Sequence, residues 1–256
     1  MITLGLDIGS IFTKGLLLEG DRIRGFLLRE TTGNIGSELE EMIEQLLSQS
    51  GLVRENIAAI VATGQGEDLY KGADYGEDDF VCVAAATRHL LPEVGLTIDI
   101  GGQSITTILS GPQGEVLNYM RNDKCASGSG RFIEVLGAAL GVPMEEIDAV
   151  AGRSQKKIAV STQCAVFAES EVISYVNRGE SIPDLVAGVC DSVARMVISQ
   201  VLRIGPVDHY TVTGGVARFQ SIVEKLEERL NGRYHPFPID PQLAAVYGAA
   251  LLGREE

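Results

Sequence analysis

The chain has 256 residues, with 21 Lys plus Arg against 35 Asp plus Glu, so its formal net charge at pH 7 is −14. That charge repels the phosphate backbone of DNA and RNA, which argues against nucleic acid as a partner. The 45% share of apolar residues is typical of a globular protein and not of a disordered chain. The four cysteines are too sparse for a disulfide scaffold.

The N-terminal residues 1–7 have no basic region and no cleavage-like site, so they indicate a strand and not a signal peptide. No segment reaches the roughly 18 to 20 consecutive apolar residues that span a bilayer. We therefore expect a cytoplasmic protein with no membrane partner. At roughly 150 residues per domain, the length favours one large or two small domains.

A strand that ends in an Asp-x-Gly turn occurs twice along the chain. Residues 4–10 (LGLDIGS) resemble residues 96–102 (LTIDIGG), and each copy is followed by a second apolar run, a turn and a third run. Those runs are residues 16–19 and 23–28 after the first copy, and 105–109 and 115–119 after the second. The sequence thus predicts two halves of related topology, each starting with three strands.

Apolar residues at helical spacing predict the remaining elements. The spacing between Ile35 and Leu47 predicts a helix, and Ser37 with Glu40 predicts a capping box at its start. The other predicted elements are strands over 57–63 and 210–213, and helices over 182–204, around 219–230 and over 243–252. Strands that alternate with helices predict an α/β fold with covered sheets.

An Asp at a strand end followed by glycine suits a phosphate site. The glycines let backbone N–H groups approach phosphate oxygens closely. Asp7 and Asp99 can hold Mg²⁺ through water and orient an attacking water, and Lys14 can reach a terminal phosphate. Together with Gly214 and Gly215 after a third strand, the two turns predict a nucleotide site.

Three motifs resemble those of the actin, sugar kinase and heat-shock chaperone ATPases. Residues 7–10 (DIGS) resemble the first phosphate motif of that superfamily, 99–103 (DIGGQ) the second, and 212–217 (VTGGVA) its adenosine motif. The resemblance implies an actin-like ATPase with two ribonuclease-H-like domains and an ATP cleft between them. The first domain would be residues 1–93 plus 241–256, and the second residues 94–240.

The resemblance also implies roles for individual residues. Asp7, Asp99 and Gln103 would be catalytic, and the two aspartates would hold Mg²⁺ through water. Further contacts with ATP or ADP would come from the same turns and from glycines that precede a helix: Gly9, Ser10, Phe12, Thr13, Lys14, Gly101, Gly102, Gln103, Gly128, Gly130, Gly214, Gly215 and Val216.

Two of the cysteines lie in distinctive stretches before predicted helices. Cys125 lies in residues 122–132 (NDKCASGSGRF) and Cys164 in residues 161–171 (STQCAVFAESE). A helix N-terminus favours an anion such as a thiolate or an iron–sulfur cluster. Two cysteines are too few for a four-thiolate [4Fe–4S] site, but two protein copies supply four. The spacing alone also allows the alternative that Cys125 and Cys164 are simply small, buried hydrophobic side chains. We interpret Cys82 and Cys190 in that second way, as core residues.

These stretches resemble the activator ATPases of 2-hydroxyacyl-CoA dehydratases and the related ATPase subunits of benzoyl-CoA reductases, over essentially the whole chain. The family implies a homodimer that bridges one [4Fe–4S] cluster, with Cys125 and Cys164 as the ligands from each copy. ATP hydrolysis would then drive a low-potential electron, received from a donor such as ferredoxin or flavodoxin, into a partner iron–sulfur dehydratase or reductase.

Four positions depart from the pattern of that family. Ser104 stands where Asp is usual, Val83 where His is usual, and Gln65 and Glu67 where an aromatic residue and Arg are usual. These departures keep a double-cubane-cluster protein open as the partner. Two further functions stay open as alternatives, namely a small-molecule kinase of the same superfamily without a cluster, and an actin-like assembly protein.

Overall fold

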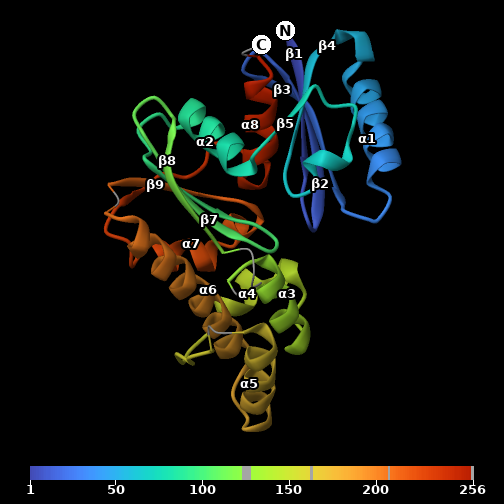
Figure 1. Cartoon of the computed structure of the whole chain (residues 1–256). Coiled ribbons are helices and arrows are strands. Elements are labelled where there is room, and N and C mark those ends of the chain that lie inside the picture. Colours follow the sequence, from blue (N-terminus) through green and yellow to red (C-terminus); the bar gives the residue numbers. More distant parts are fainter. Residues whose placement is uncertain (123–127, 162–163, 207, 255–256) are drawn as a thin grey trace. The chain divides into compact units, whose positions relative to one another are not determined.

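A computed structural model describes residues 1–122, 128–161, 164–206 and 208–254 of the chain (Figure 1). The chain divides into two compact units, each of which has its own sheet. Unit 1 comprises Met1–Pro92, Pro112–Val116 and Pro238–Glu256, and unit 2 comprises Glu93–Gly111 and Leu117–Phe237.

The sheet of unit 1 has the strand order β3-β2-β1-β4-β5. Its strands are β1 (Ile2–Ile8), β2 (Phe12–Glu19), β3 (Arg22–Glu30), β4 (Ile57–Thr63) and β5 (Tyr75–Glu77). β1, β2 and β3 pair antiparallel, whereas β4 pairs parallel with β1. The predicted series of three strands is therefore present, and the predicted strand over 57–63 is confirmed.

Helices cover both faces of this sheet (Figure 1). α1 (Ile35–Ser50) buries Leu39, Met42 and Ile43 against apolar residues of β1 and β2. α2 (Asp79–Leu90) and α8 (Ala244–Leu252) pack against each other, and α8 also contacts β1. A Cβ at Gly248 of α8 would lie 1.8 Å from the Cys82 carbonyl oxygen, so the two helices approach too closely for a side chain there.

Unit 2 repeats the arrangement, with the strand order β10-β9-β6-β7-β8. Its strands are β6 (Leu96–Ile100), β7 (Ile105–Ser110), β8 (Val116–Asn122), β9 (His209–Thr213) and β10 (Arg233–Tyr234). β6 pairs antiparallel with β7 and parallel with β9, as β1 pairs with β2 and β4. The repeat seen in the sequence is thus a repeat of topology, and the α/β class is confirmed.

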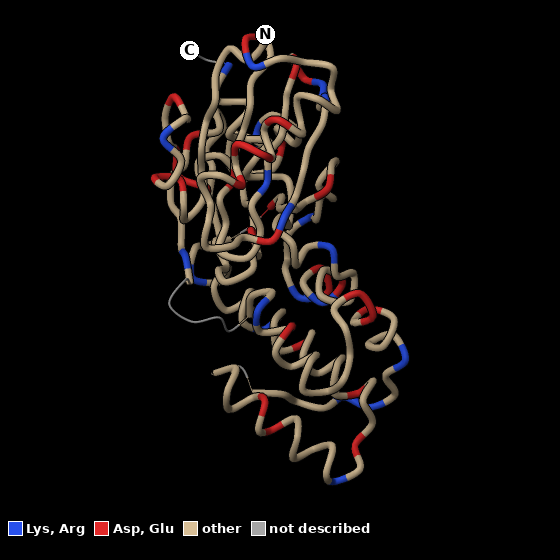
Figure 2. Tube along the Cα trace, turned by 90° about the vertical axis from the view of Figure 1, so that its right-hand side faces the viewer, with Lys and Arg blue, Asp and Glu red and all other residues tan. Residues whose placement is uncertain are grey.

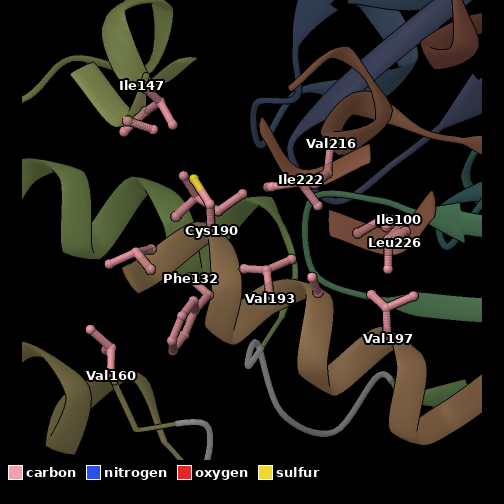
Figure 3. Packing of buried hydrophobic residues seen from close by; sticks show 14 of the residues in the cluster. Ile100, Phe132, Ile147, Val160, Cys190, Val193, Val197, Val216, Ile222 and Leu226 are labelled. Atoms are coloured by element: carbon pink, nitrogen blue, oxygen red, sulfur yellow. The ribbon is translucent and has the colours of Figure 1, made fainter. Parts of the chain in front are cut away.

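The helices of unit 2 surround one long central helix, α6 (Ile182–Ile204), whose bounds match the prediction. The other helices are α3 (Gly130–Ala139), α4 (Ile147–Ala151), α5 (Ala165–Asn177) and α7 (Gln220–Glu227). Figure 3 shows Val193 and Val197 of α6 among apolar residues of α3 and α7. α6 is long and apolar enough to cross a membrane, but 61% of its most apolar stretch is buried inside the fold.

Short 3-10 turns complete the described chain. They are η1 (Arg54–Asn56), η2 (Glu67–Leu69), η3 (Met144–Glu146), η4 (Gly215–Arg218) and η5 (Pro241–Leu243).

Two local predictions differ from the structure. The predicted capping box is wrong because α1 begins at Ile35 after the cap residue Asn34, which places Ser37 and Glu40 inside the helix. Glu40 instead accepts hydrogen bonds from the Arg54 guanidinium and, at 2.7 Å, from the Tyr70 hydroxyl. Most of the stretch 161–171 belongs to α5 and does not precede it, because that helix starts directly after Cys164.

Candidate functional site

The first predicted phosphate turn lies in unit 1, between β1 and β2. Asp7 is 6% exposed, and Lys14 Nζ donates to its Oδ2 at 2.5 Å. Antiparallel pairing brings them together, because Asp7 and Lys14 are register partners across β1 and β2. Lys14 therefore neutralises a carboxylate that would otherwise be buried without a partner.

The end of β4 packs directly on this turn. Gly64 has φ +90°, and a Cβ there would lie 2.6 Å from Asp7 Oδ1 and 2.7 Å from the Ile8 carbonyl oxygen. The N–H of Gly66 donates to that same Ile8 carbonyl at 3.0 Å. Only glycine at position 64 lets the chain approach the carboxylate this closely.

A threonine far along the chain holds the same turn. Thr31 Oγ1 donates to the Gly9 carbonyl at 2.7 Å and lies 2.9 Å from Thr13 Oγ1. The Gly9 N–H donates to the Phe12 carbonyl at 3.1 Å, while Ser10 is exposed. The predicted residues thus lie close together, with Gly9 and Ser10 in the turn and Phe12, Thr13 and Lys14 at the start of β2. No spacing pattern in the sequence connects Thr31 with Gly9, which lies 22 residues earlier in the chain.

The second predicted phosphate turn lies in unit 2, between β6 and β7. Thr213 Oγ1 donates to Asp99 Oδ1 at 2.9 Å, because the parallel pairing of β6 with β9 makes these residues neighbours. The Gly101 N–H donates to the Ser104 carbonyl at 2.9 Å and closes the turn. Gly214 has φ +84°, and a Cβ there would lie 2.4 Å from the Ile100 carbonyl oxygen, so the 213–216 segment packs on this turn.

Gly130, the first residue of α3, lies against the same turn. The Gly130 N–H donates to the Gly101 carbonyl at 2.9 Å, and a Cβ at Gly130 would lie 3.4 Å from Gly102 Cα. Gly128 has φ +83°, which glycine adopts readily. Unit 2 therefore brings these predicted nucleotide residues together at the turn: Asp99, Gly101, Gly102, Gly130 and Gly214. Gly215 follows Gly214 at the start of η4, and a Cβ at Gly128 would lie 2.7 Å from Ile105 Cδ1, just after the turn.

Two predicted contacts in unit 2 have contrasting surroundings. The side chain of Val216 is 1% exposed and belongs to the hydrophobic core, so its main chain is the part that can face a ligand. Gln103 is exposed. Ser104, which replaces the usual Asp, offers a hydroxyl in place of a carboxylate beside the turn.

The described cysteines have very different environments. Cys164 is the N-cap residue of α5 and half-buried, and its carbonyl accepts the Ala168 N–H at 2.9 Å. Cys82 and Cys190 are both 0% exposed, and burial raises the pKa of Cys82 to about 12 and that of Cys190 to about 11. Cys125 lies outside the described residues. Of the three described thiols, Cys164 is the one that a ligand can reach.

An apolar surface adjoins Cys164 on α5. Val166 is 66% exposed, Phe167 70% and Ile173 44%, which is unusual for large apolar side chains on one helix. Figure 2 shows few charged residues along α5, the lowest helix in that view. Within the described parts of the chain, no three His, Cys, Asp or Glu side chains gather into a metal site.

The other departures from the family pattern also have clear positions. Val83 is buried on α2, and Gln65 is exposed beyond β4. Burial raises the pKa of Glu67, and the neighbouring carboxylates of Asp78, Asp68, Asp79 and Glu77 raise it further. Glu67 thus lies among acidic side chains.

Comparisons with known proteins agree with this geometry over the full chain. The 2-hydroxyisocaproyl-CoA dehydratase activator of Clostridioides difficile is 38% identical over 258 aligned residues, which cover 100% of this chain and 96% of that protein. Its crystal structure with bound ADPNP superposes with a TM-score of 0.93, covering 100% of this chain and 95% of that one. One of the benzoyl-CoA reductase subunits of Thauera aromatica is 31% identical, covering 98% of this chain and 93% of that protein.

A more distant likeness shows the fold alone. A ROK family glucokinase from Streptomyces griseus, in complex with glucose and AMPPNP, has a TM-score of 0.61 at 13% identity and covers 100% of both chains. The fold is therefore that of the actin-like ATPases and sugar kinases. Residues 4–253 match the pattern of one ATPase family within this fold. The chain belongs to the BadF/BadG/BcrA/BcrD ATPase family.

Proposed function

We propose that this chain is an ATP-dependent activator that passes single low-potential electrons to a partner iron–sulfur enzyme. In each cycle ATP and water become ADP and phosphate. One electron enters from a donor of the ferredoxin or flavodoxin class, and one electron leaves to the partner. The protein would act as a homodimer with one [4Fe–4S] cluster, held by Cys125 and Cys164 of each copy, and the cluster, when bound, would take up and release that electron.

The nucleotide half of the proposal uses the two Asp-x-Gly turns. Asp7 and Asp99 would hold Mg²⁺ through water, and with Gln103 they would orient the attacking water. Backbone N–H groups of the glycine turns would stabilise the charge on the transferred phosphoryl group. The ammonium group of Lys14 has three donors, so it can keep its bond to Asp7 and still reach a phosphate.

The observation that carries the cluster half is the position of Cys164. It is the N-cap residue of the 13-residue helix α5, where the helix dipole and the backbone N–H groups favour a bound anion such as the cluster. Cys82 and Cys190 are both 0% exposed inside the fold, so their thiols are closed off from a cluster at the surface. The donor set available for a cluster is therefore Cys164 together with Cys125.

A second copy of the chain is the natural occupant of the apolar surface on α5. Two thiolates from one chain leave half of a [4Fe–4S] cluster without ligands, and a two-fold axis beside Cys164 supplies the other two. Val166 and Ile173 are seven residues apart, two helical turns, so they lie on one side of α5. Burying that side in a dimer removes it from water.

The partner is proposed by chemical class. The relatives act, by name, on 2-hydroxyisocaproyl-CoA dehydratase or are subunits of benzoyl-CoA reductase, so an iron–sulfur dehydratase or reductase of acyl-CoA substrates is the leading partner. The acidic surface around Glu67 fits a partner face different from theirs, which keeps the double-cubane-cluster protein as the alternative.

Anaerobic purification with iron analysis tests the proposal. We expect a brown protein with about four iron atoms per dimer. Cys164→Ala should lose the iron and keep ATP binding, whereas the matched control Cys190→Ala should keep both. Iron retained in Cys164→Ala contradicts the cluster assignment, and a colourless wild-type protein that phosphorylates a small hydroxyl compound establishes the kinase alternative.

A further inference from the structure

The segment that leads to Cys164 is fixed in the core of unit 2. Ile158 is 8% exposed and Val160 2%, and both belong to the hydrophobic cluster around α6 (Figure 3). Gly188 of α6 makes the close contact possible, since a Cβ there would lie 2.5 Å from the Ile158 carbonyl oxygen. Backbone therefore packs on backbone a few residues before Cys164.

Side chains from α5 and α6 bind the main chain of this segment, and Tyr175 Oη of α5 donates to the Ala159 carbonyl at 3.4 Å. Glu171 Oε2 of α5 accepts the Ser161 N–H at 2.7 Å, and Ser192 Oγ of α6 donates to the Ser161 carbonyl at 3.1 Å. Arg195 Nη2 of α6 donates to the Val160 carbonyl at 2.8 Å. We refer to Glu171, Ser192 and Arg195 as the clamp.

Burial and charge strengthen the hydrogen bonds of the clamp. Ser192 is 0% exposed, so its hydroxyl bonds the Ser161 carbonyl away from competing water. Glu171 and Arg195 are charged, and hydrogen bonds with a charged partner are shorter and stronger than neutral ones. Arg195 is itself oriented by Asp191, whose Oδ2 lies 3.1 Å from its Nε.

We propose that Glu171, Ser192 and Arg195 are positioning residues for Cys164, which hold its thiol where a ligand of the cluster must be. This inference rests on the proposed function. Ser161 is three residues before Cys164, so an extended chain lets their Cα atoms separate by at most about 11 Å. Glu171 ties Ser161 to the same helix that Cys164 caps, so the ligand is restrained from both sides. Such support keeps a ligand in place before the cluster binds.

The first test uses the cluster-free protein, so that it does not depend on the proposed function. Hydrogen exchange at the amide of Ala168, whose N–H donates to the Cys164 carbonyl, should be about tenfold faster in Glu171→Ala. Glu171→Gln should restore the wild-type rate because an amide oxygen still accepts the Ser161 N–H. The matched control is Glu169→Ala, the same change two residues away on α5, which should leave the rate unchanged.

The second test uses the loaded protein. Ser192→Ala and Glu171→Ala should release iron to a chelator about tenfold faster and alter the EPR spectrum of the reduced cluster, with ATP binding unchanged. Exchange that accelerates at 158–161 but not at Ala168, or an unaltered EPR spectrum in both variants, overturns the inference. A wild-type protein without iron contradicts the proposed function, while the exchange measurement still decides whether the clamp holds Cys164.

Discussion

Asp184 shows how one carboxylate can organise a loop. It accepts hydrogen bonds from Ser181 Oγ at 2.6 Å, from the Lys156 and Gln155 N–H groups at 2.8 and 2.7 Å, and from Ser154 Oγ at 2.9 Å. These donors, with the Ser181 hydroxyl first, hold the pKa of Asp184 well below its usual range. The carboxylate thereby ties the chain before Ile158 to the start of α6.

We expect Asp184→Asn to lower the free energy of unfolding at pH 7. A carboxyl group with a lowered pKa in the folded state stabilises the protein above its unfolded pKa of about 4, and that contribution is lost as the pH falls. The difference in the free energy of unfolding between wild type and variant, measured by urea titration, should therefore become smaller as the pH is lowered from 7 to 3. The control Glu145→Gln, away from this loop, should show no gap, and a gap of equal size at both pH values contradicts the explanation.

At the candidate site, the contacts between side chains were harder to predict from the sequence than the residues themselves. The sequence motifs identified Asp7, Asp99 and the glycine turns, because an Asp-x-Gly pattern at a strand end is local. Lys14 was expected to reach a phosphate, and in the structure it bonds Asp7, which follows from strand register and not from sequence spacing. The hydrogen bonds from Thr31 to Gly9 and from Thr213 to Asp99 carry no local signal, because the two partners of each are far apart in the sequence.

At the scale of elements, the hydrophobic pattern predicted most of what forms. α6 and β4 have their predicted bounds because apolar periodicity and burial agree along them. Element ends were less predictable. α1 starts two residues before Ser37 without any side-chain cap bond, and α5 starts inside the stretch expected to precede it.

The contact between α2 and α8 supplies a test at this scale. Gly248→Ala forces backbone to move, since the new Cβ would lie 1.8 Å from the Cys82 carbonyl oxygen. We expect a loss of about 3 kcal/mol in the free energy of unfolding, measured by denaturant titration. Gly36→Ala, in α1 with nothing within 4 Å of the new Cβ, should instead stabilise the protein by about 0.5 to 1 kcal/mol. A Gly248→Ala variant whose free energy of unfolding equals that of the wild type contradicts the close packing of α2 and α8.

Helix α6 connects both chemical regions of unit 2. Its Gln200 Nε2 donates to the Met120 carbonyl at 2.6 Å and to the Ile105 carbonyl at 3.1 Å, and Ile105 opens the strand after the second phosphate turn. Towards its N-terminus, Ser192 and Arg195 bind the segment before Cys164. One helix thus binds the main chain both at the start of β7 and just before Cys164. The position of the Cys164 segment therefore depends on the position of β7 relative to α6.

For the whole molecule, the sequence predicted the duplication and the fold, since two copies of one strand pattern require two related sheets. A site completed by a second chain is harder to derive, because no spacing within one chain encodes it. Counting cysteines against the four that a cluster needs was the available signal. In the proposed homodimer, the second copy would cover the exposed apolar residues Val166, Phe167 and Ile173 of α5.

The homodimer yields the last expectation. Phe167 is 70% exposed on α5, close in sequence to Cys164, so Phe167→Glu would place a charge within the proposed interface. We expect the dimer dissociation constant, measured by sedimentation, to rise at least about tenfold, and iron to fall in proportion because the ligand set would be split. The matched control is Leu202→Glu on α6, where the replaced side chain is 72% exposed and lies outside α5, so dimer and iron should persist. A Phe167→Glu protein that keeps both its dimer and its iron places the second copy on a different face, and loss of iron from an intact dimer separates cluster binding from association.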